Sequence, residues 1–283
     1  MRGEESGDLS VSRIKTIAIA TLLLINGFLG ALIIIGTAAD ARIERQAIEN
    51  ACAVLLNGGI TIEPDAIITK GSIRTMRTVR EYEAEEMIAQ AVLGETTMTD
   101  RGVIRLYENA QRGTADFYSA GDFEISLYDG VITKENGTMR TVQGLLRDMG
   151  FEASTQVVSL WQESETVTIT GAYEGVSIFN CTTEFIFIGD SLRTIRGRFV
   201  TGVEPVEDGA EIMQAGTALL GFLAWVRSGN AECTHIDRVE AGYHHGVSGS
   251  YGEGVLTPAW LVTVDSERYI IDDITGDIWA IAR

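Results

Sequence analysis

Residues 16–39 form an uncharged run, TIAIATLLLINGFLGALIIIGTAA. A helix of about 20 apolar residues crosses a bilayer, so the run predicts a transmembrane helix that follows a short tail over residues 1–15. A cleaved signal peptide is the alternative, because Ala39, Asp40 and Ala41 form a small-x-small cleavage pattern. The apolar region of a signal peptide is usually about 7–15 residues long, so the longer run favours an uncleaved anchor.

Basic residues flank the predicted anchor on both sides. Arg13 and Lys15 precede it, and Arg42 and Arg45 follow it. Short cytoplasmic segments usually carry the excess of Lys and Arg, and the bias here is slight. We expect a single-pass protein of the cell membrane, with its N-terminus in the cytoplasm and its C-terminal domain outside it.

One face of the predicted anchor carries small and polar side chains. Gly27 and Ala31 form a small-xxx-small pair, which lets two membrane helices approach closely. The Asn26 amide would find a hydrogen-bond partner on a second helix, worth about 0.6–2 kcal/mol; alternatively, it bonds its own backbone and the glycines are incidental. The predicted helix–helix interaction site consists of Asn26, Gly27, Gly30 and Ala31.

The net charge argues against one class of partner. The 283 residues carry a formal charge of −18, and a surface this acidic repels phosphate backbones. We therefore expect no nucleic-acid binding. The length permits one large domain or two ordinary ones.

Residues 40–62 predict a stalk helix and a linker directly after the anchor. Ile43, Ala47 and Ala51 recur at helical spacing, and Gly58 with Gly59 ends the pattern. The helix is expected to continue from the membrane.

The rest of the chain contains three similar passages, each a predicted helix followed by strand-like segments. This order is typical of an α+β fold in which helices cover one face of antiparallel sheets. We expect helix-plus-meander lobes over residues 63–204 and a C-terminal lobe over residues 205–283, with Pro205 at the boundary. The three predicted helices span residues 81–93, 141–149 and 210–227.

One cluster of metal-ligating residue types occurs. Cys233 and His235 are two residues apart, and His244 and His245 follow along the chain. Zinc prefers four such ligands in tetrahedral geometry. The spacing matches no standard zinc motif, so a surface or partly buried histidine cluster without metal is the main expectation.

The chain contains three cysteines, Cys52, Cys181 and Cys233, which is few for a disulfide scaffold. We expect three buried free thiols, because free cysteine is among the most buried residue types. A Cys181–Cys233 bridge outside the membrane is the alternative.

Other patterns that mark catalysis are weak. Asp272, Asp273 and Asp277 could bind calcium, but they lack EF-hand spacing. No Gly-x-Ser-x-Gly motif marks a nucleophile, and the glycine-rich segment over residues 246–254 lacks the Lys-Ser/Thr of a phosphate loop. We therefore expect no catalytic residues, no cofactor and no small-molecule substrate.

The C-terminal segment PAWLVTVDSERYIIDDITGDI, residues 258–278, predicts a three-stranded meander that lies against the 210–227 helix. Its sequence resembles the PepSY-type module, in which a Pro-x-Trp start and a Tyr-containing strand lead to an Asp-x-x-Thr-Gly turn and a last apolar strand. The matching residues are Pro258, Trp260, Tyr269, Asp272 or Asp273, Thr275, Gly276, Asp277 and Ile278.

The N-terminal segment SRIKTIAIATLLLINGFLGALI resembles the anchor of the YycI family of two-component system regulatory proteins. The segment AIENACAVLLNGGITI is similar to the helix that follows that anchor. The matching anchor residues are Ser12, Arg13, Lys15, Thr16, Ile17, Asn26, Phe28 and Leu29.

The resemblance to YycI implies a non-enzymatic, membrane-anchored regulator. Its expected partners are a sensor histidine kinase of the WalK type, which controls cell-wall metabolism, and a YycH-like sister protein. Contacts through the transmembrane helix and the acidic extracytoplasmic domain would modulate the kinase.

Two alternatives remain open. The first is a PepSY-type binding or inhibitory module for an extracytoplasmic peptidase or wall hydrolase. The second is a metal-dependent extracytoplasmic enzyme that uses Cys233 and the histidines.

Overall fold

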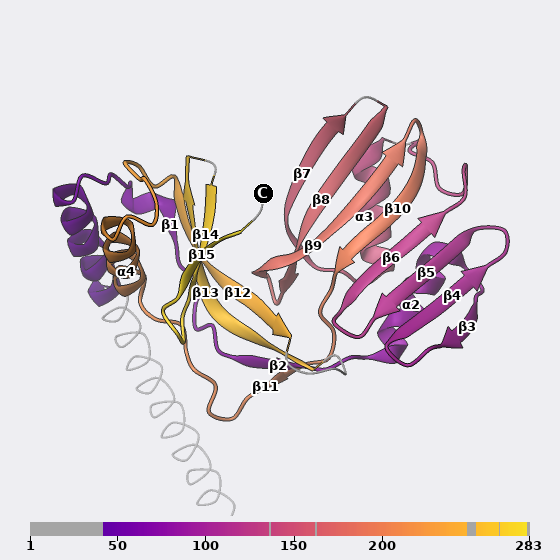
Figure 1. The fold of residues 1–283 in the computed structure, drawn as a ribbon, viewed down its shortest axis with the longest axis horizontal. Helices are drawn as coiled ribbons and strands as arrows, with labels where there is room; N and C mark the ends of the chain where they lie inside the picture. The colour runs from indigo at the N-terminus through magenta and orange to yellow at the C-terminus, as the bar shows by residue number, and fades with distance from the viewer. Residues whose placement is uncertain (1–41, 136, 162, 248–252, 266, 282–283) are drawn as a thin grey trace, which may run out of the picture.

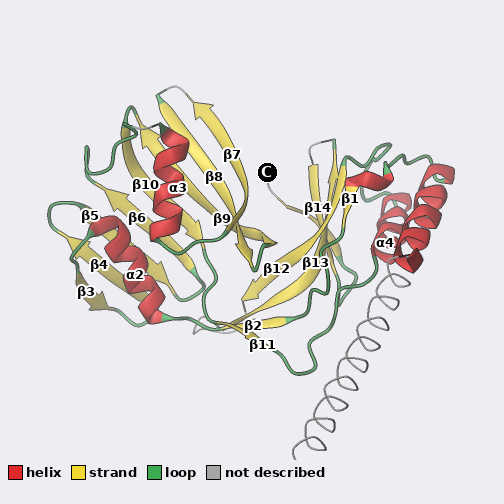
Figure 2. Cartoon of the chain, turned by 180° about the vertical axis from the view of Figure 1, so that it is seen from behind, coloured by secondary structure: helices red, strands yellow, loops and turns green. Residues whose placement is uncertain are grey.

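The computed structural model describes residues 42–135, 137–161, 163–247, 253–265 and 267–281, and the chain has a mixed α+β fold dominated by sheet. The fold consists of two lobes joined side by side (Figure 1). In each lobe, helices pack on one side of the strands (Figure 2). The predicted anchor, residues 16–39, lies outside the described residues. Among those that are described, no helix is long and apolar enough to cross a membrane.

The C-terminal lobe combines the start and the end of the described chain. Its helices are one over residues 42–57, a short 3-10 turn η1 (Pro64–Ala66), and α4 (Ala215–Arg227). Antiparallel pairing joins β12 to β13, β13 to β14 and β14 to β15. The strands of the lobe are β1 (Ile67–Ile68), β2 (Met76–Thr78), β11 (Val203–Pro205), β12 (Arg238–Val247), β13 (Gly254–Val264), β14 (Glu267–Asp272) and β15 (Ile278–Ile281).

The core of this lobe forms where α4 and the 42–57 helix meet the strands. Phe222 of α4 is fully buried and lies 5.8 Å from the Tyr269 ring on β14. Trp260 of β13 is 2% exposed, and its Nε1 donates to the carbonyl oxygen of Met213 at 3.2 Å. Ala51 and Leu55 of the 42–57 helix are buried in the same cluster, so this helix contributes to the core of the lobe.

The predicted C-terminal meander is present as β13, β14 and β15, against α4. The prediction placed the start of α4 too early, at residue 210. Residues 210–212 instead pair with the segment before β2: the amide of Thr75 donates to Ala210 and the amide of Ile212 donates to Ile73. The Met213 amide donates to the Asp273 carboxylate at 2.6 Å, and α4 then begins at Ala215.

The middle lobe contains one antiparallel sheet and two helices, α2 (Tyr82–Leu93) and α3 (Thr138–Asp148). The sheet order runs β9-β10-β6-β5-β4-β3, and β8 and then β7 extend it beyond β9. The strands are β3 (Thr97–Asp100), β4 (Ile104–Asn109), β5 (Gly113–Tyr118), β6 (Asp122–Leu127), β7 (Ala153–Trp161), β8 (Ser164–Tyr173), β9 (Val176–Ile188) and β10 (Ser191–Arg198).

The two helices of the middle lobe cover one face of its sheet (Figure 2). Ile88 and Val92 of α2 and Val142 of α3 turn toward the strands and are almost fully buried. The strands contribute every second side chain, as expected for a sheet with one buried face. Aromatic rings are prominent among them, including Phe117, Phe123, Phe185 and Phe187.

One long strand connects the lobes. β9 pairs with β8 and β10 in the middle lobe, and near its start Ile178 pairs in parallel with Tyr243 of β12. A Cβ atom at Gly242 would lie 2.7 Å from the carbonyl oxygen of Ser177, so glycine permits this close approach. The Asn180 side chain extends the pairing, because it donates to the carbonyl of His245 and accepts from its amide, both at 2.8 Å.

Candidate functional site

β7 is one of the two outermost strands of the middle-lobe sheet, and all of its residues are exposed. It is 9 residues long, ASTQVVSLW, and contains no charged residue. Within the described chain it pairs with β8 alone. Its other edge therefore presents unpaired N–H and C=O groups, which can template a further strand.

Apolar side chains project from both faces of β7. Val158 pairs with the buried Val167 of β8 and so lies on the helix-covered face, as does Leu160. Val157 and Trp161 lie on the opposite face. Every residue of β7 is exposed, and Trp161 is 76% exposed. The helices α2 and α3 do not reach far enough to cover this strand.

The other terminal strands of the described sheet are shorter. β3 has 4 residues and ends in Asp100, whereas β11 has 3 residues and contains Glu204 and Pro205. β15 has 4 residues. Short strands, charges and proline are the usual devices that prevent unwanted pairing at an edge. β7 is long and has neither charge nor proline.

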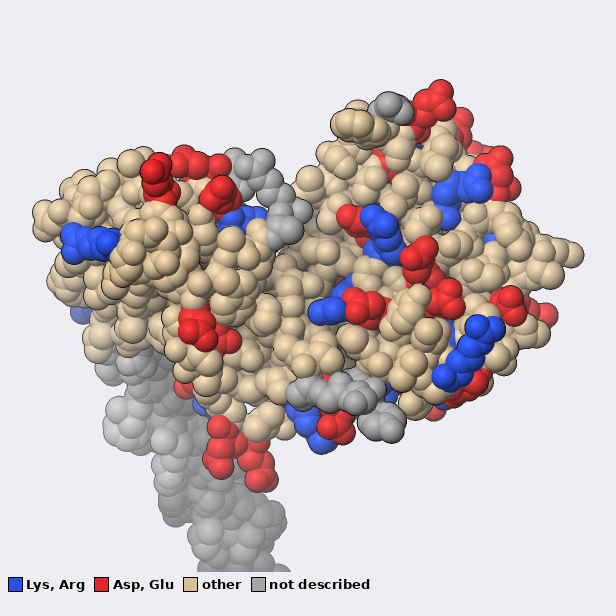
Figure 3. Space-filling view, in the orientation of Figure 1, with Lys and Arg blue, Asp and Glu red and all other residues tan. Residues whose placement is uncertain are grey.

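The surface around β7 contrasts with the acidity of the whole chain. β7 forms the flank of the middle lobe on the side toward the C-terminal lobe (Figure 1). Figure 3 shows that this flank is largely free of charged side chains. Exposed carboxylates lie at both ends of the strand: Glu152 and Glu174 at its start, and Glu163 and Asp190 at its end.

A cavity of about 180 Å³ lies behind the start of β7, next to the junction of the lobes. Its lining is mostly apolar and includes Phe151, Phe199 and Cys181. Arg198 borders the cavity and forms a bidentate ion pair with Asp122. Its Nε and Nη2 each lie 2.9 Å from one carboxylate oxygen of Asp122. Burial raises the pKa of the Cys181 thiol to about 12. The thiol is therefore protonated at neutral pH and is a poor nucleophile.

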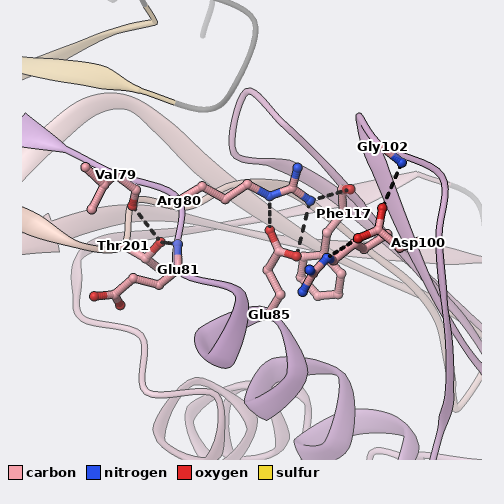
Figure 4. Close-up of polar contacts among 9 residues, drawn as sticks. Val79, Arg80, Glu81, Glu85, Asp100, Gly102, Phe117 and Thr201 are labelled. Atoms are coloured by element: carbon pink, nitrogen blue, oxygen red, sulfur yellow. Dashed lines mark hydrogen bonds and ion pairs between the residues drawn. The ribbon is translucent and has the colours of Figure 1, made fainter.

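Two chain connections cross between the lobes, and Phe199 and Val200 of one of them line this cavity. Figure 4 shows the polar contacts around these connections. Thr201 accepts a hydrogen bond from the amide of Glu81 and donates one to the carbonyl of Val79. Arg80 donates to both carboxylate oxygens of Glu85 and to the carbonyl of Phe117. These contacts fasten the two connecting segments to each other and to the first turns of α2.

The four candidate metal ligands, Cys233, His235, His244 and His245, do not form one cluster. His235 faces Thr61, with 2.9 Å between His235 Nδ1 and Thr61 Oγ1, whereas His244 and His245 lie at the far end of β12. His244 contacts the Trp279 ring, and its neighbour His245 points to the opposite face of the strand. Among the described residues, no three His, Cys, Asp or Glu side chains are grouped so as to hold a metal ion.

His245 is the most unusual histidine. It is 6% exposed, and its Nε2 lies 3.1 Å from Thr78 Oγ1. Its Nδ1 is buried without a hydrogen-bond partner in the described structure. Burial, together with a smaller contribution from the nearby positive charge of Arg198, lowers the pKa of His245 to about 4. The ring is therefore neutral at physiological pH.

The other candidate residues serve the fold. Asp272 Oδ1 accepts hydrogen bonds from the amides of Ile274 and Thr275 and so shapes a turn. Asp273 accepts the hydrogen bond from the Met213 amide described above. Among the described residues, it does not group with Asp277 and a third ligand to hold a metal ion. Cys52, Cys181 and Cys233 are free thiols. Asn26, Gly27, Gly30 and Ala31 lie outside the described residues.

Sequence reasoning missed β7 as a site. It identified the segment as a strand without assigning it a role. The available signal was an uncharged strand of 9 residues in a chain with a charge of −18. What the sequence lacked was the sheet order, which alone shows that β7 lies at an edge.

Comparisons with known proteins show the fold but no family. No family model matches the chain, and no curated protein matches it. The resemblance to YycI is therefore not confirmed. Among solved structures, an uncharacterized protein from Eubacterium rectale is similar at a TM-score of 0.50 and 9% identity, over 76% of this chain and 89% of that one. This similarity shows a shared fold and assigns no activity.

A second solved structure, the C-terminal domain of Bacillus megaterium YpeB, gives a TM-score of 0.36 at 12% identity. It covers 73% of this chain and 100% of that domain. The score is too low to support an argument about this protein.

Proposed function

We propose that this chain is a membrane-anchored, extracytoplasmic binding module that regulates a protein partner by contact rather than by catalysis. The observation that carries the proposal is the open edge of β7, with its unpaired backbone groups and exposed apolar side chains. Strand addition to such an edge is a common mode of peptide recognition. The uncharged segment over residues 16–39 supports the membrane attachment.

The partner we propose is a sensor histidine kinase of the WalK type, acting together with a YycH-like sister protein. The basis is the resemblance of the anchor and of the helix after it to YycI. The anchor face with Asn26 and Gly27 would contact a kinase transmembrane helix, and β7 would contact an extracytoplasmic segment. Regulation then follows if the two contacts favour one state of the kinase over the other.

The alternative partner is an extracytoplasmic peptidase or wall hydrolase, held by a PepSY-type module. The meander of β13, β14 and β15 against α4 is the feature that favours it. Both alternatives describe a binding protein, and they differ in the class of partner.

Crosslinking of the full chain in its native membrane tests the proposal. A photo-crosslinker at Ser159 of β7, followed by purification and mass spectrometry, identifies the protein in contact. A sensor kinase supports the first partner class, and a hydrolase supports the second.

A matched pair of variants controls this experiment. Val158→Lys places a charge on the open edge, and Val103→Lys places the same charge on a similarly exposed site elsewhere; the two valines are 46% and 55% exposed. The crosslink should be lost with Val158→Lys and kept with Val103→Lys. A crosslink that survives both changes overturns the proposed role of β7.

A further inference from the structure

We propose that β7 binds an extended segment with a continuous apolar run and basic residues at its ends. This inference rests on the proposed function, and it adds the chemistry of the bound segment. The partner strand would extend the sheet of the middle lobe by one strand beyond β7.

The apolar run follows from the two faces of β7. In an added strand, successive side chains point to opposite faces of the sheet. On the helix-covered face they would meet Val158 and Leu160, and on the other face Val157 and Trp161. Because both faces offer exposed apolar groups, a segment that is apolar at consecutive positions buries more surface than one that alternates with polar residues.

The basic ends follow from the carboxylates that flank the strand. Glu152 precedes β7, and Glu163 follows it in the turn to β8. The turns beside them add Glu174 and Asp190. None of these four carboxylates forms an ion pair with a described residue. Lys70 lies beside Glu174, where its Nζ donates to the carbonyl of Gly175 at 3.0 Å. Basic residues at the ends of a bound segment would complement these charges.

The same charges disfavour a second copy of this chain as the occupant. Antiparallel pairing of two β7 strands about a two-fold axis at Val157 would place Ala153 opposite Trp161. It would bring Glu152 of each copy beside Glu163 of the other. Like charges across a strand pair are destabilising, and each chain already carries a charge of −18.

Synthetic peptides test the inference on the full chain in detergent micelles. The first probe is the acetylated peptide KKTVVIVTKK, and the second is EETVVIVTEE. The third probe is the peptide KKTVVIVTKK with alternate backbone amides N-methylated, so that these amides cannot donate the hydrogen bonds of strand pairing. Binding is measured by fluorescence anisotropy at low salt, about 50 mM, where charge effects are large.

The lysine-flanked peptide should bind at least tenfold more tightly than the other two. Val158→Lys should weaken its binding at least tenfold, whereas Val103→Lys, with the same net charge, should not. Replacing Glu152→Lys and Glu163→Lys together should reverse the preference between the lysine-flanked and the glutamate-flanked peptide.

Three results would overturn the inference: equal binding of the lysine- and glutamate-flanked peptides, full binding of the methylated peptide, or a stable dimer that Val158→Lys converts to a monomer. If the peptide preference fails while Val158→Lys still abolishes the membrane crosslink, the binding function stands and only the inferred chemistry is wrong. If the crosslink is insensitive to Val158→Lys, the proposed function itself fails.

Discussion

Arg80 and Glu85 form an ion pair that is almost completely withdrawn from solvent, with side chains 8% and 3% exposed. Arg80 Nη2 lies 3.2 Å from a carboxylate oxygen of Glu85 and 3.2 Å from the carbonyl oxygen of Phe117. The pair lies where the chain enters the middle lobe, between β2 and α2 (Figure 4). Because bulk water solvates neither side chain, each charge is stabilised by the opposite charge of its partner.

Breaking this pair should destabilise the protein strongly. Glu85→Gln leaves the Arg80 guanidinium buried without a counter-charge, and we expect the free energy of unfolding to fall by about 3–5 kcal/mol. Replacing both residues, Arg80→Met with Glu85→Leu, should cost less than the single change, because no buried charge remains. Urea unfolding of the full chain, followed by circular dichroism, measures the difference.

An exposed ion pair provides the control. Arg193 lies 3.2 Å from Asp129, and the two side chains are 38% and 79% exposed. Arg193→Ala should cost about 0–1 kcal/mol, since water solvates both charges. A Glu85→Gln variant as stable as Arg193→Ala would contradict the assigned importance of the buried pair.

A second prediction concerns the contact between the lobes. A Cβ atom at Gly242 would lie 2.4 Å from Phe179 Cζ and 2.7 Å from the Ser177 carbonyl oxygen. We expect Gly242→Val to separate β12 from β9 and to widen the molecule in solution scattering. Gly246→Val on the same strand is the control, because the nearest atom to its added Cβ is 3.9 Å away. Identical scattering profiles for the two variants would show that the β9–β12 contact does not hold the lobes together.

Local patterns in the sequence predicted much of the fold. The residues of α2 recur at helical spacing, and the predicted range 81–93 agrees closely with Tyr82–Leu93. The C-terminal meander was also predicted, since Thr275 and Gly276 mark a turn; Gly276 has φ 72°, which glycine adopts readily. A helix and a turn of this kind are determined mainly by residues adjacent in the sequence, so they can be predicted from it.

Features that depend on distant residues could not be predicted. The start of α4 was placed too early because the pairing of residues 210–212 with the segment before β2 is visible only in three dimensions. The packing of Ala51 in the same core cluster as α4 also depends on residues far apart in the sequence. Among the candidate site residues, His235 and His244 are close in sequence, yet an extended strand separates residues by about 3.3 Å per position. His235 therefore lies just before the start of β12, and His244 lies near its end.

A third prediction concerns acid sensitivity at the lobe junction. Burial lowers the pKa of His245 to about 4 from its ordinary value of 6.5. The unfolded chain therefore binds a proton at a higher pH than the folded chain does. The stability that the neutral ring contributes is fully present above about pH 6.5 and is lost as the pH falls toward 4. From the size of the shift, the loss should reach about 3 kcal/mol.

Comparison of wild type with His245→Gln isolates this effect. The many carboxylates also titrate in this range, but they are common to both proteins and cancel in the difference. The unfolding free energy of wild type minus that of His245→Gln should decrease as the pH is lowered from 7 to 4, because only wild type carries this histidine. A difference that stays constant over this range would show that His245 does not titrate as its burial implies.

The fourth prediction concerns the anchor, and it rests on the sequence. Asn26→Leu removes the polar group that would bond a second membrane helix, and Gly27→Ile adds bulk where two helices would meet. Each change should weaken association with the transmembrane helix of the proposed kinase partner, read as a reduced signal in a membrane two-hybrid assay. For Asn26→Leu the expected loss is about 0.6–2 kcal/mol. Gly36→Ile is the matched control, because helical spacing of about 3.6 residues per turn places Gly36 on the opposite face from Gly27. Undiminished signals for both Asn26→Leu and Gly27→Ile would exclude helix pairing through this face, and an equal loss with Gly36→Ile would show that added bulk disturbs insertion of the anchor instead.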